Sequence, residues 1–281
     1  MKAVDKRVNG LAFVLSGGGS LGAFQAGVIY GLAKSGVFPS TIVGASVGAL
    51  NGAFLAFFPD LNMLEELKTV WLTMKARKMF SLNPIRIWQN LWGRQDYLFT
   101  HEVIDRLLET FLGNLKIEDA KIPLRIVTTE ITTGKKVVLS EGDVKRALSA
   151  SIAIPGVFSP VELDGRVLID GGVSCYMDIE TAVNMGARYI VALDTTPLLR
   201  IRKWQPMGII KTISHAQYLF LKVRGDEEVK RWRSAAQVIH IRPRLNKMFN
   251  PNLFNHTREL LDQGERRAQL ALRLMRVLQW V

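Results

Sequence analysis

A run of three glycines between a short apolar segment and an apolar helical segment constrains the fold more than any other feature of this sequence. Residues 11–15 (LAFVL) read as a buried strand, residues 16–19 (SGGG) as a tight turn and residues 20–34 as a helix. A second strand at residues 41–44 and a second helix at residues 47–57 follow directly. Strands that alternate with helices in this way are typical of a parallel sheet. We therefore expect an α/β protein with a mainly parallel central sheet and flanking helices.

The glycine turn can hold an anion in either of two ways. Gly17, Gly19 and Gly22 fit G-x-G-x-x-G, the spacing of a dinucleotide site in which a pyrophosphate rests on a helix N-terminus. Such a site needs an acidic residue about 20 residues later for the ribose hydroxyl, but no Asp or Glu stands between Asp5 and Asp60. The same outward-facing N–H groups would stabilise the oxyanion of an acyl-transfer intermediate. The missing acid favours the oxyanion, with a nucleotide-binding regulatory protein as the alternative.

A second glycine motif stands where the ribose-binding acid is missing. Residues 44–48 read GASVG, which fits the G-x-S-x-G pattern of a nucleophile elbow. Gly44 and Gly48 let the strand turn sharply into the helix, so the hydroxyl of Ser46 projects from the end of the strand. The positive end of the new helix favours negative charge at that hydroxyl. Ser46 is therefore the candidate nucleophile, and the glycine turn lies one strand away from it.

A nucleophilic serine needs a base, and the sequence offers two kinds. His101, His215, His240 and His256 are the four histidines, of which His240 and His256 keep a Ser–Asp–His triad of the α/β-hydrolase type open. The other candidate is Asp170, which ends the apolar segment RVLID before Gly171 and Gly172. A turn of two glycines allows a carboxylate to approach a neighbouring loop closely. An aspartate with an ordinary pKa is a weak base, so this assignment requires burial to raise its pKa.

These motifs and their order resemble the patatin-like phospholipase family of serine lipid acyl hydrolases. That family has a glycine-rich oxyanion loop, then G-x-S-x-G, then D-G-G or D-G-A, and uses a Ser–Asp dyad without a histidine. Residues 150–160 (ASIAIPGVFSP) also resemble the family's segment before the D-G-G. The resemblance implies a three-layer patatin-like core and hydrolysis of a lipid carboxylic ester through an acyl-enzyme, with no metal or cofactor. The residues carried over are Ser46 and Asp170 as nucleophile and base, Gly17, Gly18 and Gly19 as the oxyanion hole, and Gly22, Gly44, Gly48, Gly171 and Gly172 as motif glycines.

Charge divides the chain into two parts. The net charge is +12, of which residues 1–196 carry +1 and residues 197–281 carry +11. We therefore expect a catalytic domain over residues 9–196 and a basic, mostly helical C-terminal region over residues 197–281, packed on or beside the core. Cations interleaved with aromatic residues favour contact with an anionic membrane surface. No motif accompanies the charge that would indicate nucleic acid.

The sequence also predicts where the protein acts. Residues 35–59 carry no charge, but their proline, strand-like and glycine-turn elements favour a buried strand and a buried helix over a membrane span. The N-terminus lacks the composition of a signal peptide. The single cysteine, Cys175, excludes an internal disulfide and fits a reducing compartment. We expect a cytoplasmic protein in peripheral contact with the inner face of the membrane.

Overall fold

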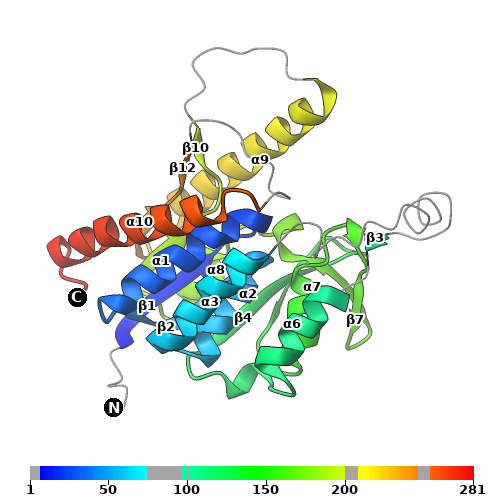
Figure 1. Cartoon of the computed structure of the whole chain (residues 1–281), viewed down its shortest axis with the longest axis horizontal. Coiled ribbons are helices and arrows are strands. Elements are labelled where there is room, and N and C mark those ends of the chain that lie inside the picture. The colour runs from blue at the N-terminus through cyan, green and yellow to red at the C-terminus, as the bar shows by residue number, and fades with distance from the viewer. Residues whose placement is uncertain (1–6, 75–96, 100–101, 200–207, 246–253) are drawn as a thin grey trace.

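The computed structural model describes residues 7–74, 97–99, 102–199, 208–245 and 254–281. It is an α/β structure built on a twisted, mostly parallel sheet with helices on both faces (Figure 1). Within the described ranges eight strands form this sheet, in the order β11-β9-β1-β2-β4-β8-β7, with β5 also paired to β4. Their bounds are β1 Arg7–Leu15, β2 Phe38–Ala45, β4 Leu124–Glu130, β5 Lys136–Leu139, β7 Val161–Leu163, β8 Arg166–Asp170, β9 Tyr189–Leu193 and β11 Gln237–Ile241. The expected mainly parallel sheet with flanking helices is confirmed.

The helices follow the pattern expected for crossover connections. The α-helices are α1 Gly22–Lys34, α2 Val47–Phe57, α3 Leu61–Thr73, α6 Glu102–Leu112, α7 Val144–Ser151, α8 Ile179–Asn184, α9 Ile209–Trp232 and α10 Thr257–Val277. Short 3₁₀ turns lie at η1 Gly19–Leu21, η2 Ile117–Asp119 and η3 Gly171–Val173. Two small strand pairs, β3 Tyr97–Phe99 with β6 Gly156–Phe158 and β10 Leu198–Leu199 with β12 Arg244–Leu245, complete the described elements.

The direction of pairing changes at β4. Strands β11, β9, β1, β2 and β4 run parallel, whereas β4 pairs antiparallel with both β5 and β8, and β7 pairs antiparallel with β8. Tight turns reverse the chain within two of these pairs, since β4 turns into β5 at Gly134 and β7 turns into β8 at Asp164 and Gly165, all three with positive φ. In the sequence, Thr133-Gly134 and Asp164-Gly165 each stand between two apolar segments and predict both hairpins, which the structure confirms.

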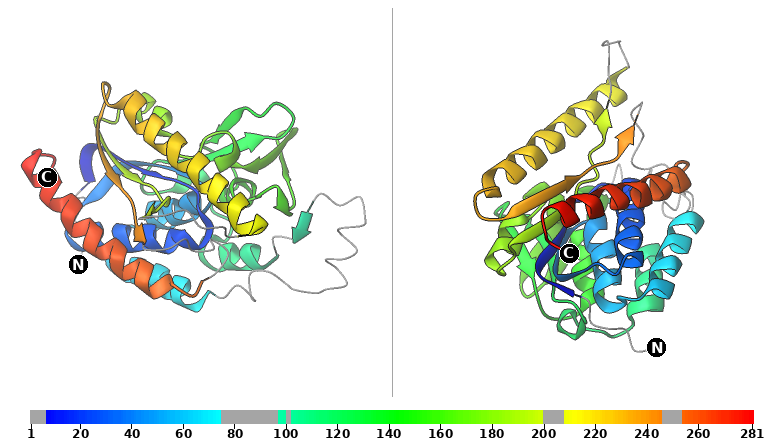
Figure 2. Two further views of the ribbon diagram at one scale, coloured as in Figure 1. Left: turned by 90° about the horizontal axis from the view of Figure 1, so that it is seen from above. Right: turned by 90° about the vertical axis from the view of Figure 1, so that its left-hand side faces the viewer.

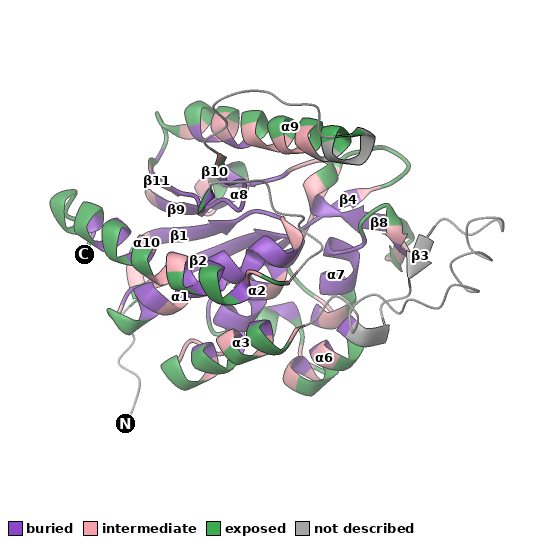
Figure 3. Cartoon of the chain, turned by 45° about the horizontal axis from the view of Figure 1, so that its top comes forward, coloured by how far each residue is buried: buried purple, intermediate pink, exposed green. Residues whose placement is uncertain are grey.

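Two apolar layers pack against the two faces of the sheet. Because side chains alternate along a strand, Leu11, Phe13 and Leu15 of β1 enter the larger core beneath α1, α2, α3 and α10, whereas Ala12 and Val14 enter the smaller core beneath α8 and α9. Purple ribbon through the centre of Figure 3 marks this buried interior. The uncharged stretch of residues 35–59 supplies β2 and α2, and nearly all of α2 is buried. In the described part of the chain no helix is both long and apolar enough to cross a bilayer.

The C-terminal region is built into this architecture. Strand β11 adds to the edge of the sheet beside β9, and α10 lies along α1 (Figures 1 and 2). Apolar residues at helical spacing after Thr257 predict one buried face, and the structure buries Leu260, Leu261, Ala268, Leu272 and Met275 of α10. Leu278, expected on the same face, is 46% exposed because α10 ends before it. The division of the chain after residue 196 stays a prediction.

Candidate active site

Ser46 stands at a strained turn between β2 and α2. Its backbone has φ 54° and ψ −130°, a conformation that residues with a Cβ rarely adopt. Glycines on either side allow the chain to pack tightly here. A Cβ on Gly44 would lie 2.6 Å from the carbonyl oxygen of Gly48, and a Cβ on Gly48 would lie 2.5 Å from the carbonyl oxygen of Leu15. The strand–turn–helix arrangement that the sequence predicts for GASVG is therefore present.

Asp170 reaches the same end of the sheet by a different route. It is the last residue of β8 and is paired with Thr128 of β4 in the antiparallel register. On the other side of β4, Ala45 of β2 is paired with Val127. Strand β4 thus separates the two chain segments, and both Ser46 and Asp170 lie beside the middle of β4, near Val127 and Thr128.

The Asp170 carboxyl is a buried group with one unsatisfied oxygen. Oδ1 accepts a hydrogen bond from the backbone N–H of Gly172 at 2.7 Å, whereas Oδ2 is buried and has no hydrogen-bond partner among the described residues. Burial raises the pKa of Asp170 to about 6, against the opposing effects of the Ser46 hydroxyl and the Gly172 amide. A carboxylate with this pKa accepts a proton far more readily than an exposed aspartate. The strand register places Ser46 and Asp170 on either side of Val127 and Thr128, and the Ser46 hydroxyl is the side-chain group that lowers the pKa of Asp170.

The segment at the end of α7 positions both residues. Ser151 Oγ accepts a hydrogen bond from the backbone N–H of Ser46 at 2.9 Å and donates one to the carbonyl oxygen of Val127 at 2.7 Å. The carbonyl oxygen of Ala153 accepts from the backbone N–H of Asp170 at 3.0 Å. The family resemblance of residues 150–160 predicts no role for Ser151. The sequence signal for such a role is a hydroxyl residue, Ser151, at the end of a buried helix.

The glycine turn lies against Ser46. A Cβ on Gly17 would be 3.2 Å from the Cβ of Ser46 and 3.7 Å from its Oγ. Gly18 has φ 144° and Gly19 has φ 56°, both unfavourable for residues with a Cβ. Within the described part of the chain, the N–H groups of Gly17, Gly18 and Gly19 donate no hydrogen bond. Unsatisfied N–H groups beside a serine hydroxyl are the donors that a developing oxyanion requires.

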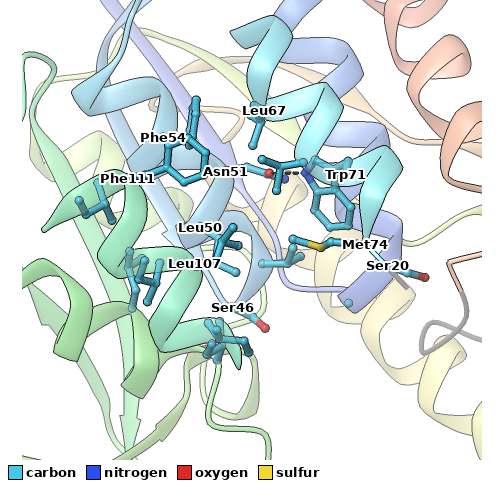
Figure 4. Close-up of a pocket in the computed structure, with 18 of the residues that line it drawn as sticks. Ser20, Ser46, Leu50, Asn51, Phe54, Leu67, Trp71, Met74, Leu107 and Phe111 are labelled. Carbon is cyan, nitrogen blue, oxygen red and sulfur yellow. Dashed lines mark hydrogen bonds between the residues drawn. The ribbon is translucent and has the colours of Figure 1, made fainter. Parts of the chain in front are cut away.

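An apolar cavity of about 120 Å³ opens from Ser46 into the larger core (Figure 4). Its polar element is a buried chain in which the indole Nε1 of Trp71 donates to Asn51 Oδ1 at 3.0 Å, and Asn51 Nδ2 donates to the carbonyl oxygen of Gly22 at 2.9 Å. Such a lining suits an apolar chain attached to a group that reacts at Ser46. The apolar lining residues include Leu50, Phe54, Leu67, Val70, Met74, Leu107, Phe111, Leu148, Ile152, Ile154 and Phe158.

None of the histidines with described positions is placed beside Ser46 by the sheet. His240 lies on β11, three strands away from β2, a separation of about 14 Å at the usual strand spacing. Its Nε2 is instead bonded to Asp194 Oδ2 at 2.8 Å. His256 lies 3.3 Å from Glu259 at the start of α10, and His215 lies on α9 near Tyr218. His101 is outside the described residues.

The described residues contain no group of three or more His, Cys, Asp or Glu side chains arranged to hold a metal ion. The residues that converge at the site are a hydroxyl, a carboxyl and backbone amides. These groups are sufficient for nucleophilic acyl transfer.

Comparison with known proteins agrees with this geometry. The family model described as patatin-like phospholipase matches residues 13–183 of the chain, a range that includes the glycine turn, Ser46 and Asp170. The chain belongs to the patatin-like phospholipase family. Its fold is also similar to that of VipD from Legionella pneumophila, with a TM-score of 0.50 at 14% identity, covering 93% of this chain and 66% of VipD.

Curated relatives in the patatin-like family are much longer proteins. The chain is 29% identical over 188 residues to patatin-like phospholipase domain-containing protein 7 of Rattus norvegicus, and 27% identical over 188 residues to neuropathy target esterase sws of Drosophila melanogaster. In each case the match covers 66% of this chain, but only 14% of the rat protein and 13% of the fly protein. A protein of Mycobacterium bovis from the NTE family is 32% identical over 163 residues, which cover 58% of this chain and 42% of that protein.

The patatin-like glycine turn permits a specific test by substitution. We expect Gly17→Ala to fold but to reduce turnover by about 10²-fold, an effect comparable to the loss of one oxyanion donor, because the methyl group would displace the reacting carbonyl from the loop amides. Gly17 does not have a positive φ, yet its new methyl group would crowd the Ser46 side chain. Ester hydrolysis and thermal unfolding measured together check this. Unchanged turnover in the folded variant would show that the space beside Ser46 is not used.

Gly18→Ala provides a comparison with a different expected outcome. A methyl group there would meet Thr195 Oγ1 at 2.0 Å, in a backbone conformation that disfavours any Cβ. We expect this variant to lose folding stability as well as activity, so Gly17→Ala is the cleaner probe of catalysis.

Proposed function

We propose that this protein is a serine lipid acyl hydrolase that cleaves carboxylic esters through an acyl-enzyme on Ser46. The observation that carries the proposal is the buried Asp170 carboxyl, which has one unsatisfied oxygen and the Ser46 hydroxyl as its close neighbour. Asp170 is the general base, and the amides of Gly17, Gly18 and Gly19 form the oxyanion hole. The cavity that opens from Ser46 receives the acyl chain.

The reaction proceeds in two halves on these groups. Asp170 takes the proton of the Ser46 hydroxyl as Oγ attacks the ester carbonyl carbon, and the loop amides hold the oxyanion that forms. The intermediate collapses when the alcohol leaves with the proton from Asp170, so Ser46 keeps the acyl group. Water then attacks the acyl-enzyme with Asp170 again as base, which releases the fatty acid and restores the Ser46 hydroxyl.

The pH dependence of hydrolysis tests the role of Asp170. A general base must be ionised to accept a proton, and the pKa of Asp170 is about 6. We therefore expect kcat/KM for a soluble ester to be nearly constant above pH 7 and to fall about tenfold for each pH unit well below 6. If kcat/KM instead began to fall only near pH 4, the carboxyl would be behaving as an exposed aspartate, and this would count against Asp170 as the base.

A Ser–Asp–His triad of the α/β-hydrolase type is the competing mechanism. His240 lies on β11 at the edge of the sheet and is bonded to Asp194, which also accepts a hydrogen bond from Arg242. This pairing supports a structural role for His240. The absence of an acid at the end of β2 likewise argues against a nucleotide-binding protein.

We also propose that the enzyme meets its lipid at an anionic membrane surface, from the cytoplasmic side, through the C-terminal region. Helix α9 carries exposed Ile213, Phe220 and Val223, at 64%, 55% and 51% exposure, among basic side chains such as Lys222 and Arg224. Apolar side chains that enter a bilayer beside cations suit an anionic interface. Phe220 is the exposed aromatic of this helix, and the Arg224 guanidinium lies 5.4 Å from its ring centre.

The position of α9 relates this surface to the active site. The helix leads into β11, which is parallel to β9, so α9 begins at the end of the sheet where the parallel strands finish. Ser46 lies at that same end. Arg224 Nη2 also donates to the carbonyl oxygen of Ser174 at 2.8 Å, which ties α9 to the loop that follows Asp170.

Vesicle co-sedimentation tests the membrane contact. We expect binding to anionic vesicles, weaker binding to zwitterionic ones, and loss of the difference at high salt because screening shortens the attraction to below 8 Å. The double variant Ile213→Asn with Phe220→Asn should reduce binding about tenfold or more, because each substitution removes about 1–3 kcal/mol of apolar burial.

A matched control lies on α10. Leu274 and Val277 are also exposed, at 50% and 78%, but Trp280 Nε1 of the same segment donates to Gln237 at the start of β11, the opposite end of the sheet. Leu274→Asn with Val277→Asn should therefore leave binding unchanged. An equal loss of vesicle binding in the two double variants, or equal binding of the wild type to anionic and zwitterionic vesicles, would contradict this proposal. The basic region would then be a solvent-exposed surface with no role at the membrane.

A further inference from the structure

The carbonyl group of Gly17 points away from Ser46 and is held by hydroxyl groups. Strands β9 and β2 lie on opposite sides of β1, so Thr195, which follows β9, and Ser46, which follows β2, flank the glycine turn. Thr195 Oγ1 donates a hydrogen bond to the carbonyl oxygen of Gly17, and Ser16 Oγ donates to the same oxygen at 3.1 Å. This oxygen therefore faces the β9 side of the turn.

The direction of this carbonyl fixes the direction of the next amide. In a trans peptide the C=O and N–H groups point in opposite directions, and the described chain contains no cis peptide. The N–H of Gly18 thus points toward the β2 side of the turn, where Ser46 lies. It donates to no acceptor among the described residues.

Nothing intrinsic to the sequence of the turn keeps this peptide in place. Glycines on both sides of a peptide unit permit rotation at low cost. A flipped Gly17–Gly18 peptide would turn its carbonyl oxygen toward Ser46, where it would repel an oxyanion instead of stabilising it. We propose that Thr195 is a positioning residue that holds the Gly17–Gly18 peptide with its N–H directed at the oxyanion. This inference rests on the proposed acyl-transfer function.

The neighbouring Tyr176 and Asp194 leave the hydroxyl of Thr195 able to donate. The buried Asp194 carboxylate only accepts hydrogen bonds, so Tyr176, whose hydroxyl lies 2.9 Å from Asp194 Oδ1, must donate its one proton there. The Tyr176 oxygen then has no proton for Thr195 Oγ1 at 3.0 Å or Ser16 Oγ at 3.2 Å. Ser16 Oγ can supply a proton to the Tyr176 oxygen, and the Thr195 hydroxyl donates to the Gly17 carbonyl.

Side chains on β11 and just beyond it hold Asp194 in turn. His240 Nε2 lies 2.8 Å from Asp194 Oδ2, and Arg242 Nε donates to the same oxygen at 2.6 Å. Although burial alone would raise the pKa of Asp194, these two partners hold it below its ordinary value. The carboxylate thus stays an acceptor across the neutral range. The turn beside Ser46 is thereby anchored to strands β9 and β11.

Substitution of Thr195 tests the proposal. Thr195→Val keeps the side-chain shape and removes the Thr195 donor, which leaves only the Ser16 hydroxyl on this carbonyl and makes a flip of the peptide less costly. We expect kcat to fall between about 10-fold and about 10²-fold, up to the cost of one oxyanion donor. KM should change by less than about threefold, because the lost interaction forms in the transition state. Thr195→Ser keeps the donor and should retain most of the wild-type kcat.

Thr196→Val is the matched control. Thr196 is also buried and donates through its hydroxyl to Asp194 at 2.6 Å, but it makes no described contact with the glycine turn. It should lose folding stability to a similar extent as Thr195→Val and keep the wild-type kcat. The proposal is overturned if Thr195→Val keeps the wild-type kcat. It is also overturned if the kcat of Thr195→Ser or of Thr196→Val falls as far as that of Thr195→Val.

A crystal structure of Thr195→Val separates this inference from the proposed function. Absence of Ser46-dependent hydrolysis in the wild-type protein would overturn the function. The structure of the variant would still decide the inference, because a Gly17 carbonyl that keeps its wild-type direction without the Thr195 donor would contradict it. A reversed or mixed carbonyl direction is the expected result.

Discussion

Ser46→Ala is expected to abolish both ester hydrolysis and covalent labelling by a fluorescent fluorophosphonate. The substitution removes the only atom that can carry the acyl group in the proposed mechanism, so turnover should fall to background. Alanine and serine have similar backbone preferences, so the positive φ of residue 46 costs the variant no more than the wild type. Labelling followed by gel fluorescence, together with hydrolysis of a short-chain ester and thermal unfolding, measures all three properties.

Ser40→Ala is the matched control for this experiment. Ser40 lies on the same strand, β2, and its hydroxyl donates to the carbonyl oxygen of Leu11 at 3.0 Å, away from the carboxyl end of the sheet. This variant should be labelled and should turn over like the wild type. Undiminished labelling of a folded Ser46→Ala protein would place the nucleophile elsewhere, and the proposed function would then fail with it.

Much of this fold could be predicted from local sequence patterns. The hairpin turns at Gly134 and Gly165 and the elbow at Ser46 each depend on a few consecutive residues whose backbone preferences are strong. The uncharged stretch of residues 35–59 likewise contains its own turn signals, which is why a buried strand and helix were the better interpretation. In each case the physical cause lies within one short segment.

The arrangement of distant segments could not be read in the same way. Asp170 lies near Ser46 because β8 pairs antiparallel with β4. This pairing could not be predicted, because no local sequence pattern specifies which strand lies next to another. The roles of Ser151 and Thr195 arise from contacts across 105 and 178 residues of sequence. Net charge is the reason that the sequence analysis treats the C-terminal region as a separate part. In the structure, β11 of this region is the edge strand of the central sheet. The position of a strand follows from its packing and not from net charge.

Asp170→Asn is expected to lower kcat by about 10²-fold or more, because the amide cannot accept the proton of Ser46 at neutral pH. The side chain keeps its size, and its oxygen can still accept the Gly172 N–H, so the turn after β8 should be preserved. Labelling by fluorophosphonate should slow in parallel with hydrolysis. His240→Ala and His256→Ala should each retain turnover, although His240→Ala is expected to lower stability by removing a partner of buried Asp194. An active Asp170→Asn together with an inactive histidine variant would favour the triad.

The same substitution should leave the folded state more stable at neutral pH. Burial raises the pKa of Asp170 from 3.8 to about 6, so the folded protein binds a proton that the unfolded chain has released between these values. Above pH 6 the folded state must therefore hold an unfavourable buried charge, at a cost on the order of 3 kcal/mol for a shift of about two pH units. Asparagine carries no charge, so Asp170→Asn should unfold at a higher temperature than the wild type at pH 7. The difference should shrink as the pH falls from 6 toward 4, because the buried aspartate of the folded state becomes protonated over this range. A lower unfolding temperature at pH 7 would mean that the charged carboxyl stabilises the fold, whereas a catalytic base held ready for proton transfer is expected to weaken it.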